Sequence, residues 1–167
     1  MSSVQAQVIN PFAIRYQTSQ KGGLRFISNA SVSCNSSTTC TTAKAEVPPA
    51  GTGQNNNFTM SYIDIDGDAS TYMSSSDSLN LANCSEILWA GLYWGAKITT
   101  STTNYASRSN VKLKVNNNAY QVLTADQTLS YSGTVSYFCF KNITSIVQSA
   151  GIKARFTVAD LVTQTNS

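Results

Sequence analysis

The sequence has no histidine, few charged residues and no long hydrophobic run. Without histidine the chain holds no Ser-His-Asp or Cys-His catalytic site and no metal site built on imidazole. Charged residues make up 11% of the 167 residues, against about a quarter of an ordinary soluble domain. No stretch approaches the roughly 18 apolar residues of a membrane-spanning helix. We therefore expect no membrane insertion. The lysines and arginines are scattered singly rather than gathered in a basic patch, so we expect no nucleic-acid binding.

Hydroxyl and amide side chains supply most of the polarity, since Ser, Thr and Asn occupy 58 positions. The chain is also 41% hydrophobic, with eight Tyr, six Phe and two Trp, whereas disordered chains are poor in aromatic residues. We expect one folded domain over residues 10–167. Residues 1–9 are interpreted as the remnant of a signal-peptide region, because Val4-Gln5-Ala6 is typical of a cleavage site. An ordinary N-terminus is the alternative.

The four cysteines form an even set, which together with the low charge is typical of an exported protein with two disulfides. Only five residues separate Cys34 from Cys40, so we expect these two to pair locally. That leaves Cys84 to pair with Cys139. The alternative is a zinc site with all four cysteines as ligands, but the chain has no Cys-x2-Cys pair.

Short alternating and β-branched segments predict an all-β fold. A hairpin is expected from residues 13–20 and 24–34 around Lys21-Gly22-Gly23, and a second one turns at Asn116-Asn117-Asn118. Eight or nine short strands with one short helix are typical of a β-sandwich, and we expect a jelly-roll-like one. The other expected strands are 58–64, 78–81, 87–96, 134–140 and 153–158; the expected loops are 35–54 and 96–110, and the helix is 143–149, between Asn142 and Gly151.

Three of the eight acidic residues, Asp64, Asp66 and Asp68, lie within five positions. Carboxylates this close repel one another, and they can converge on one hard cation where the chain turns, so Ca²⁺ is the expected ligand. The segment is not an EF-hand, because Gly67 is its fourth residue rather than its sixth and Ser75 replaces the final Glu. The alternative is a solvated turn in which the Asp side chains accept backbone N–H groups.

The run 87–96 is the strongest strand in the sequence. Alternation along it places Trp89 and Tyr93 on one face and Trp94 on the other. Both faces are apolar, so we expect a central strand covered on both sides. Trp89 and Tyr93 either pack in the core or form a platform on which sugar rings stack.

The sequence offers little for catalysis. The remaining acids are isolated along the chain, and no pair is marked for glycoside hydrolysis. Gly-x-Ser-x-Gly and Gly-rich phosphate loops are absent, and acid–base chemistry would depend on scattered carboxylates, Tyr or Lys. We therefore expect that the protein is not an enzyme and has no organic cofactor.

Five segments, taken in order, resemble a known type of protein. They are Asn-Pro-Phe-Ala-Ile-Arg-Tyr-Gln-Thr-Ser-Gln-Lys-Gly-Gly (10–23), Ser-Tyr-Ile-Asp-Ile-Asp-Gly-Asp (61–68), Ser-Ser-Ser-Asp-Ser-Leu (74–79), Trp-Ala-Gly-Leu-Tyr-Trp-Gly (89–95) and Tyr-Phe-Cys-Phe-Lys-Asn-Ile-Thr (137–144). Together they are similar to the N-terminal domain of large surface proteins of Bacteroidota, of the gliding-motility adhesin type. The resemblance covers nearly the whole chain, and the Trp-Ala-Gly-Leu-Tyr-Trp run is its most specific part.

The resemblance implies type IX secretion, display on the bacterial cell surface, and adhesion to surfaces or polysaccharide. It also implies that Ser78, in Asp-Ser-Leu, is a site of O-glycosylation. The long repeat array and the sorting region of the family are not in this sequence, so neighbouring domains of the same large protein are expected partners. The family domain continues past the point that matches Ser167, which would leave strand 153–158 as an unpaired edge.

Three functions remain open at this point. The first is a non-enzymatic adhesive module at the exposed end of a surface protein. The second is a calcium-dependent, lectin-like carbohydrate-binding module that uses the three Asp residues and an aromatic platform. The third is a structural cap of a surface filament, with an apolar patch against a neighbouring domain.

Overall fold

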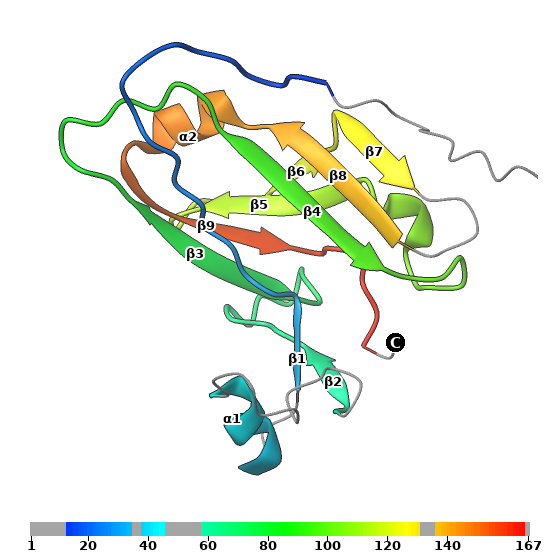
Figure 1. Cartoon of the computed structure of the whole chain (residues 1–167). Helices are drawn as coiled ribbons and strands as arrows, with labels where there is room; N and C mark the ends of the chain where they lie inside the picture. The colour runs from blue at the N-terminus through cyan, green and yellow to red at the C-terminus, as the bar shows by residue number, and fades with distance from the viewer. Residues whose placement is uncertain (1–12, 35–37, 46–57, 131–135, 166–167) are drawn as a thin grey trace, which may run out of the picture.

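The computed structural model describes residues 13–34, 38–45, 58–130 and 136–165. Within these residues, nine strands form three antiparallel sheets (Figure 1), which confirms the all-β prediction. A four-stranded sheet has the order β3-β9-β5-β6, a three-stranded sheet the order β4-β8-β7, and β1 pairs with β2. The strands are β1 (Val32–Cys34), β2 (Met60–Tyr62), β3 (Ser74–Asn80), β4 (Gly91–Lys97), β5 (Asn110–Val115), β6 (Gln121–Thr124), β7 (Gln127–Ser130), β8 (Ser136–Asn142) and β9 (Lys153–Ala159).

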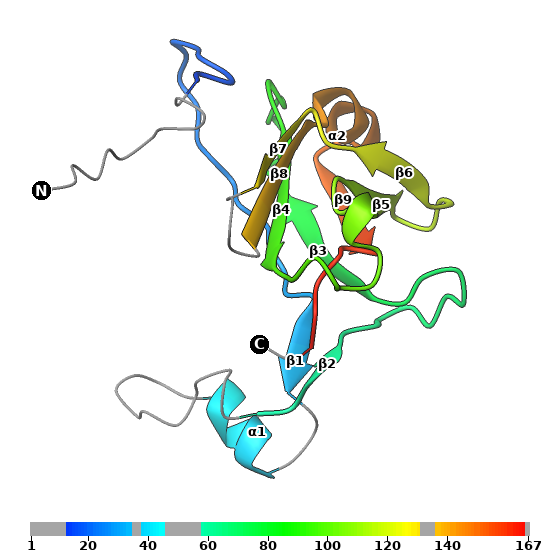
Figure 2. The ribbon, with the colours of Figure 1, turned by 90° about the vertical axis from the view of Figure 1, so that its right-hand side faces the viewer.

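The two larger sheets face one another as a sandwich (Figure 2). Alternation along β5 buries Val111, Leu113 and Val115 between them. From the facing sheet, Trp94 of β4 and Tyr137 of β8 point into the same core. Helix α2 (Thr144–Ala150) closes one end of the sandwich, and β1, β2 and helix α1 (Thr38–Lys44) protrude at the other (Figure 1). No helix among the described residues combines the length and the apolar character needed to cross a membrane.

Strand β9 lies in the middle of the four-stranded sheet. It pairs with β3 along its whole length and with β5 on its other side. The prediction that strand 153–158 forms an unpaired edge is therefore wrong. Its residues suit a central place, because Ala154 and Phe156 are buried on the inner face while Thr157 and Ala159 are buried on the outer face.

The hairpin predicted from residues 13–20 and 24–34 does not form. Of these residues only Val32–Cys34 is a strand, and its partner is β2. Residues 13–30 instead form an irregular segment, with bends at Arg15 and at Gln20–Lys21, that passes along the outside of the sandwich (Figures 1 and 2). The segment is held by the sandwich rather than by a neighbouring strand: Ile27 packs against the core, and the Ser28 backbone N–H donates to Asp77 Oδ2 at 3.1 Å.

The short disulfide forms as predicted, between Cys34 and Cys40, with Cα atoms 5.9 Å apart. It joins the end of β1 to helix α1. The helix lies inside the segment 35–54 that the sequence predicted as a loop, and residues 35–37 and 46–54 of this segment are outside the described part of the chain. The predicted signal-peptide remnant, residues 1–9, is also outside it.

The second predicted disulfide is wrong, since Cys84 and Cys139 are free thiols. Cys139 lies on β8 opposite Trp94 and points into the core. Cys84 is exposed in the turn that follows β3. Burial raises the pKa of the Cys139 thiol, which keeps it protonated and unreactive.

Several local predictions hold. Asn116 has a positive φ of 52° in the turn after β5. Helix α2 begins and ends one residue later than predicted, at Thr144 and Ala150, with Gly151 as its C-cap. Its N-cap residue is Ile143 rather than the predicted Asn142, although Asn142 Oδ1 accepts the backbone N–H of Thr144 at 3.0 Å. Strand β7, which lies at the edge of the three-stranded sheet, was not predicted.

Candidate functional site

The acidic segment is a loop between β2 and β3 that is tied together by one buried serine. Ser74 is fully buried, and its Oγ lies 2.9 Å from Asp64 Oδ1 and 2.8 Å from Asp66 Oδ1. The same Oγ accepts the backbone N–H of Ile65 at 3.0 Å. The hydroxyl proton is therefore shared between two carboxylates, which fixes them in place without a cation between them.

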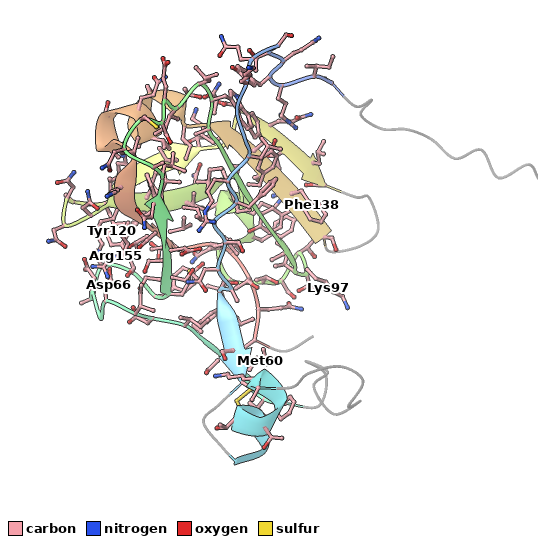
Figure 3. All side chains as sticks on the ribbon, turned by 60° about the vertical axis from the view of Figure 1, so that its left-hand side comes forward. Met60, Asp66, Lys97, Tyr120, Phe138 and Arg155 are labelled. Atoms are coloured by element: carbon pink, nitrogen blue, oxygen red, sulfur yellow. A yellow bond between two sulfur atoms is a disulfide. The ribbon has the colours of Figure 1, made fainter. Side chains whose placement is uncertain are left out.

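The negative charge of Asp66 is balanced by a lysine of the four-stranded sheet. Its Oδ2 forms an ion pair with Lys114 of β5 and accepts the hydroxyl of Tyr120 at 2.6 Å. Figure 3 shows Asp66 and Tyr120 together on one side of the molecule. Burial alone would raise the pKa of Asp66, but the bonds from Lys114, Tyr120 and Ser74 outweigh it and hold that pKa far below its ordinary value. Burial, followed by the bond to Asp66, raises the pKa of Tyr120.

The other two carboxylates serve the loop backbone. Asp64 Oδ1 lies 3.3 Å from the Gly67 nitrogen, and Asp68 Oδ1 accepts the Ser70 N–H at 2.9 Å. The hydrogen bond from Ser70 lowers the pKa of Asp68. Within the described residues no three Asp, Glu or Cys side chains are grouped so that they share one ion. These contacts are those expected of the backbone-bonded turn, the alternative to a calcium site; calcium binding itself is untested.

The aromatic strand exposes one of its faces. Strand β4 is an edge strand, so the prediction of a central strand covered on both sides is wrong. On its outer face Tyr93 lies opposite Phe140 of β8, and Gly95 lies opposite Phe138. Tyr93 is 58% exposed and Phe138 is 65% exposed. These two side chains are diagonal neighbours on one face of an antiparallel pair and both are open to solvent, while the Tyr93 ring itself packs against Phe140 with centroids 5.0 Å apart; we call the pair the Tyr93–Phe138 platform.

Gly95 leaves the space that the Phe138 ring occupies on this platform. A Cβ atom on Gly95 would lie 2.4 Å from the backbone oxygen of Tyr137 and 2.9 Å from the Phe138 ring. Only a hydrogen fits at this position, and the Phe138 ring lies over Gly95. The platform is built on two paired strands rather than on a loop.

Trp89 does not belong to the platform. Its ring is stacked between Phe140 and Tyr16, with centroids 6.2 and 5.9 Å apart and interplanar angles of 14° and 17°. It also covers Gly91, where a Cβ would lie 2.6 Å from the Trp89 ring. Of the two side chains predicted to stack on sugar, Tyr93 is available and Trp89 is engaged in packing.

Phe138 and Arg15 were not predicted as site residues. The alternation of Phe138 and Phe140 along β8 places them on one face, but it does not tell which face is outside. The Arg15 guanidinium lies 4.0 Å from the centre of the Phe140 ring and 5.8 Å from that of Tyr93. It reaches this place from the irregular N-terminal segment, and nothing in its local sequence signals the contact.

Ser78, the predicted glycosylation site, lies on β3 at the edge of the four-stranded sheet. It is exposed, as an attachment site must be. Its modification stays a prediction.

A pocket of about 240 Å³ lies on the four-stranded sheet, lined in part by Tyr72, Lys112 and Asp160. Its polar groups are largely engaged with one another. Lys112 Nζ is 2.8 Å from Asp160 Oδ2 and donates to the Ser70 carbonyl at 2.6 Å, and the Tyr72 hydroxyl donates to the Leu161 carbonyl. The exposed platform on the opposite sheet is therefore the stronger candidate site.

Comparisons of the chain with models of protein families, with curated proteins and with solved structures found no significant match.

Proposed function

We propose that the domain is a non-enzymatic adhesive module of a bacterial surface protein, and that it binds polysaccharide by stacking sugar rings on the Tyr93–Phe138 platform. The observation that carries the proposal is a pair of aromatic side chains, 58% and 65% exposed, at diagonally neighbouring positions on the outer face of a sheet. Large apolar rings held side by side in water favour a ligand that covers them.

The chemistry of stacking suits this arrangement. A pyranose ring has an apolar face of C–H groups, and an aromatic ring offers it both area and a negative π face. Because Tyr and Phe have few rotatable bonds, little conformational entropy is lost when a ligand orders them. A platform on paired strands binds an extended chain along its surface, as adhesion to a polymer requires.

The cellular setting is part of the proposal. The Cys34–Cys40 disulfide is compatible with an oxidising compartment, and the resemblance to surface adhesins supports secretion and display on the cell surface. Surface loops rich in Ser, Thr and Asn add hydrogen-bonding groups with little charge.

A second candidate function is that of a structural cap, which rests on a different surface. Leu24 and Phe26 of the irregular N-terminal segment are largely exposed, although both are apolar. Their alternation places both on one side of the segment, where a neighbouring domain of the same protein would cover them. This function requires no polysaccharide, so the binding experiment separates the two.

The experiment measures binding of the wild-type chain and of Tyr93→Ala and Phe138→Ala to arrayed and insoluble polysaccharides. Each substitution is expected to weaken binding about five- to tenfold, from the roughly 1 kcal/mol or more that one aromatic contact contributes. Phe26→Ala is the matched control, because Phe26 is 82% exposed and lies off the platform. Polysaccharide recovered with its chain length unchanged supports a non-enzymatic role.

Three results would contradict the proposal: absence of binding to every polysaccharide, equal weakening by Phe26→Ala, or release of shortened chains. The structural cap would be favoured by two results together. The domain would bind no polysaccharide, and it would associate with the neighbouring domain of its protein in a way that Phe26→Ala abolishes.

A further inference from the structure

We propose that the polysaccharide is anionic, and that Arg15 and Lys97 hold its charged groups at either end of the Tyr93–Phe138 platform. This inference rests on the proposed function, whose binding surface it extends. It concerns the class of ligand, which the aromatic rings alone do not determine.

Among the described residues, Arg15 has no carboxylate as an ion-pair partner. Its guanidinium is stacked on Phe140 and donates to the side-chain oxygen of Gln127, which is neutral. Among the described residues the three ion pairs involve other cations, namely Lys112, Lys114 and Lys141. Contact with an aromatic ring fixes the position of a guanidinium and leaves its N–H groups free for an anion.

Lys97 lies on the same face, beyond the other end of the platform. Alternation along β4 places Gly91, Tyr93, Gly95 and Lys97 on the outer side, and Lys97 is exposed opposite Ser136. Lys97 is four residues from Tyr93, a separation of about 13 Å along a strand. In Figure 3 Lys97 and Phe138 lie toward one side of the molecule, and Asp66, Tyr120 and Arg155 lie toward the other.

The described acidic residues do not cancel these two charges. Asp64, Asp66 and Asp68 belong to the loop on the opposite sheet, where Asp66 is paired with Lys114. Asp126 precedes β7 at the platform side, and it is already paired with Lys141, whose Nζ is 2.6 Å from its Oδ1. Neither Arg15 nor Lys97 has an ion pair among the described residues, so two positive charges remain available at the platform, although the chain as a whole carries a net charge of only +3.

Arg15 and Lys97 lie at either end of the two rings. This order matches a polymer in which apolar sugar faces alternate with negative groups. A guanidinium binds a carboxylate or a sulfate through two parallel hydrogen bonds, and an ammonium adds a point charge. Single exposed ion pairs contribute little, but a polymer presents the same anion many times, so that modest contacts add up in avidity. An acidic protein fits less well: beside the two rings the face carries the apolar Phe140 and Leu129, but the rest of it is made of glycines, Lys97 and Ser136, so apolar side chains cover only part of it.

The test compares polymers that differ only in charge: polygalacturonate with its fully methyl-esterified form, and dextran sulfate with dextran. The first pair tests carboxylate and the second tests sulfate. We expect the charged member of at least one pair to bind more tightly, and the difference to shrink as salt is raised to about 0.5 M. Arg15→Gln and Lys97→Gln should each weaken binding of that charged polymer about three- to fivefold and leave binding of its neutral form unchanged.

Arg155→Gln is the matched control. Arg155 is exposed, has no ion pair among the described residues, and lies on β9 in the other sheet, so its removal changes net charge equally without touching the platform. Far-ultraviolet circular dichroism and melting temperature establish that each variant is folded, and Lys97→Gln tests the inference even if Arg15→Gln disturbs the N-terminal segment.

The outcomes distinguish the two proposals. If neutral and charged polymers bind alike and Phe138→Ala weakens both, the platform binds polysaccharide but the inference of an anionic ligand is overturned. Equal weakening by Arg155→Gln overturns it as well, since net charge alone would then explain the effect. Poly-L-glutamate binding more tightly than the sugar polymers would identify an acidic protein as the partner. If no polymer binds, the proposed function itself fails.

Discussion

Replacing Asp66 by Asn removes one charge from the acidic loop and leaves the size of the side chain unchanged. Asp66 and Lys114 are each less than a fifth exposed, with side-chain values of 19% and 18%, so water only partly screens the pair. Losing a charged hydrogen-bond acceptor at such a site, with the ammonium left unpaired, is expected to cost about 1–2 kcal/mol. For a chain of this length that corresponds to a fall in melting temperature of about 2–8 °C.

The pH dependence has a definite sign. The pKa of Asp66 is lower in the folded state than in the unfolded state, so the ionised carboxylate stabilises the fold above the unfolded pKa of about 4. This contribution is lost progressively as the pH falls below that value. The difference in stability between the wild type and Asp66→Asn should therefore be full at pH 7 and shrink in acid.

The assay is thermal and urea denaturation of four chains: wild type, Asp66→Asn, Lys114→Met and the double variant. The coupling energy from this cycle isolates the Asp66–Lys114 interaction, and we expect about 1 kcal/mol. Glu86→Gln is the control, because Glu86 is exposed and has no ion pair in the described part of the chain. A coupling energy of zero, or equal destabilisation by Glu86→Gln, would refute the reasoning.

Three further predictions concern the sheet, the thiols and the acidic loop. Gly95→Ala should lower the free energy of unfolding by about 1–3 kcal/mol, because its Cβ would lie 2.4 Å from a backbone oxygen. The control is Gly22→Ala, whose Cβ meets no atom within 4 Å and which should leave stability nearly unchanged. Equal melting temperatures of the two variants would contradict this prediction. Mass spectrometry after alkylation without reductant should find two free thiols in the denatured chain. In the native chain only Cys84 should react quickly, because Cys139 is 2% exposed. A chain without free thiols would show that the second disulfide forms after all. Millimolar calcium should leave the melting temperature unchanged, since the carboxylates are already engaged, and a rise that Asp66→Asn abolishes would establish a calcium site.

Local patterns in the sequence predicted the features that depend on local physics. The turn at Asn116, the helix that ends at Gly151 and the short Cys34–Cys40 disulfide all follow from residues a few positions apart. The buried alternation of β5 is visible for the same reason. These elements are set by backbone preference, spacing and period, which a single sequence displays.

The predictions that were wrong concern which tertiary partner covers or pairs with a segment. Both faces of the run 87–96 are apolar, and the sequence does not show that one of them, with Tyr93, remains open beside the edge of a sheet. Residues 13–30 alternate like a strand, yet no neighbouring strand pairs with them. The pairing of Cys84 with Cys139 was assigned by elimination, and tertiary packing put one sulfur in the core and the other in water.

The site was predicted in part for the same reason. Tyr93 was identified from its strand, whereas Phe138 and Arg15 gain their roles from long-range contacts with β4 and β8. The acidic residues were recognised as a group, but their partners Lys114 and Tyr120 lie about 50 positions away in the sequence. Such partners decide whether carboxylates bind a metal ion or a lysine.

The place of β9 between β3 and β5 constrains how the chain assembles. Residues of β3 find their partners 73 to 85 positions later, from Asn80 with Lys153 to Ser74 with Ala159. Pairings this distant make folding slow, because a large loop must close before they contribute. Until β9 arrives, β3 and β5 have a vacant position between them, so a nascent chain gains little from collapsing early. The topology thereby favours a single folding event of this domain, after the segment 153–159 has become available.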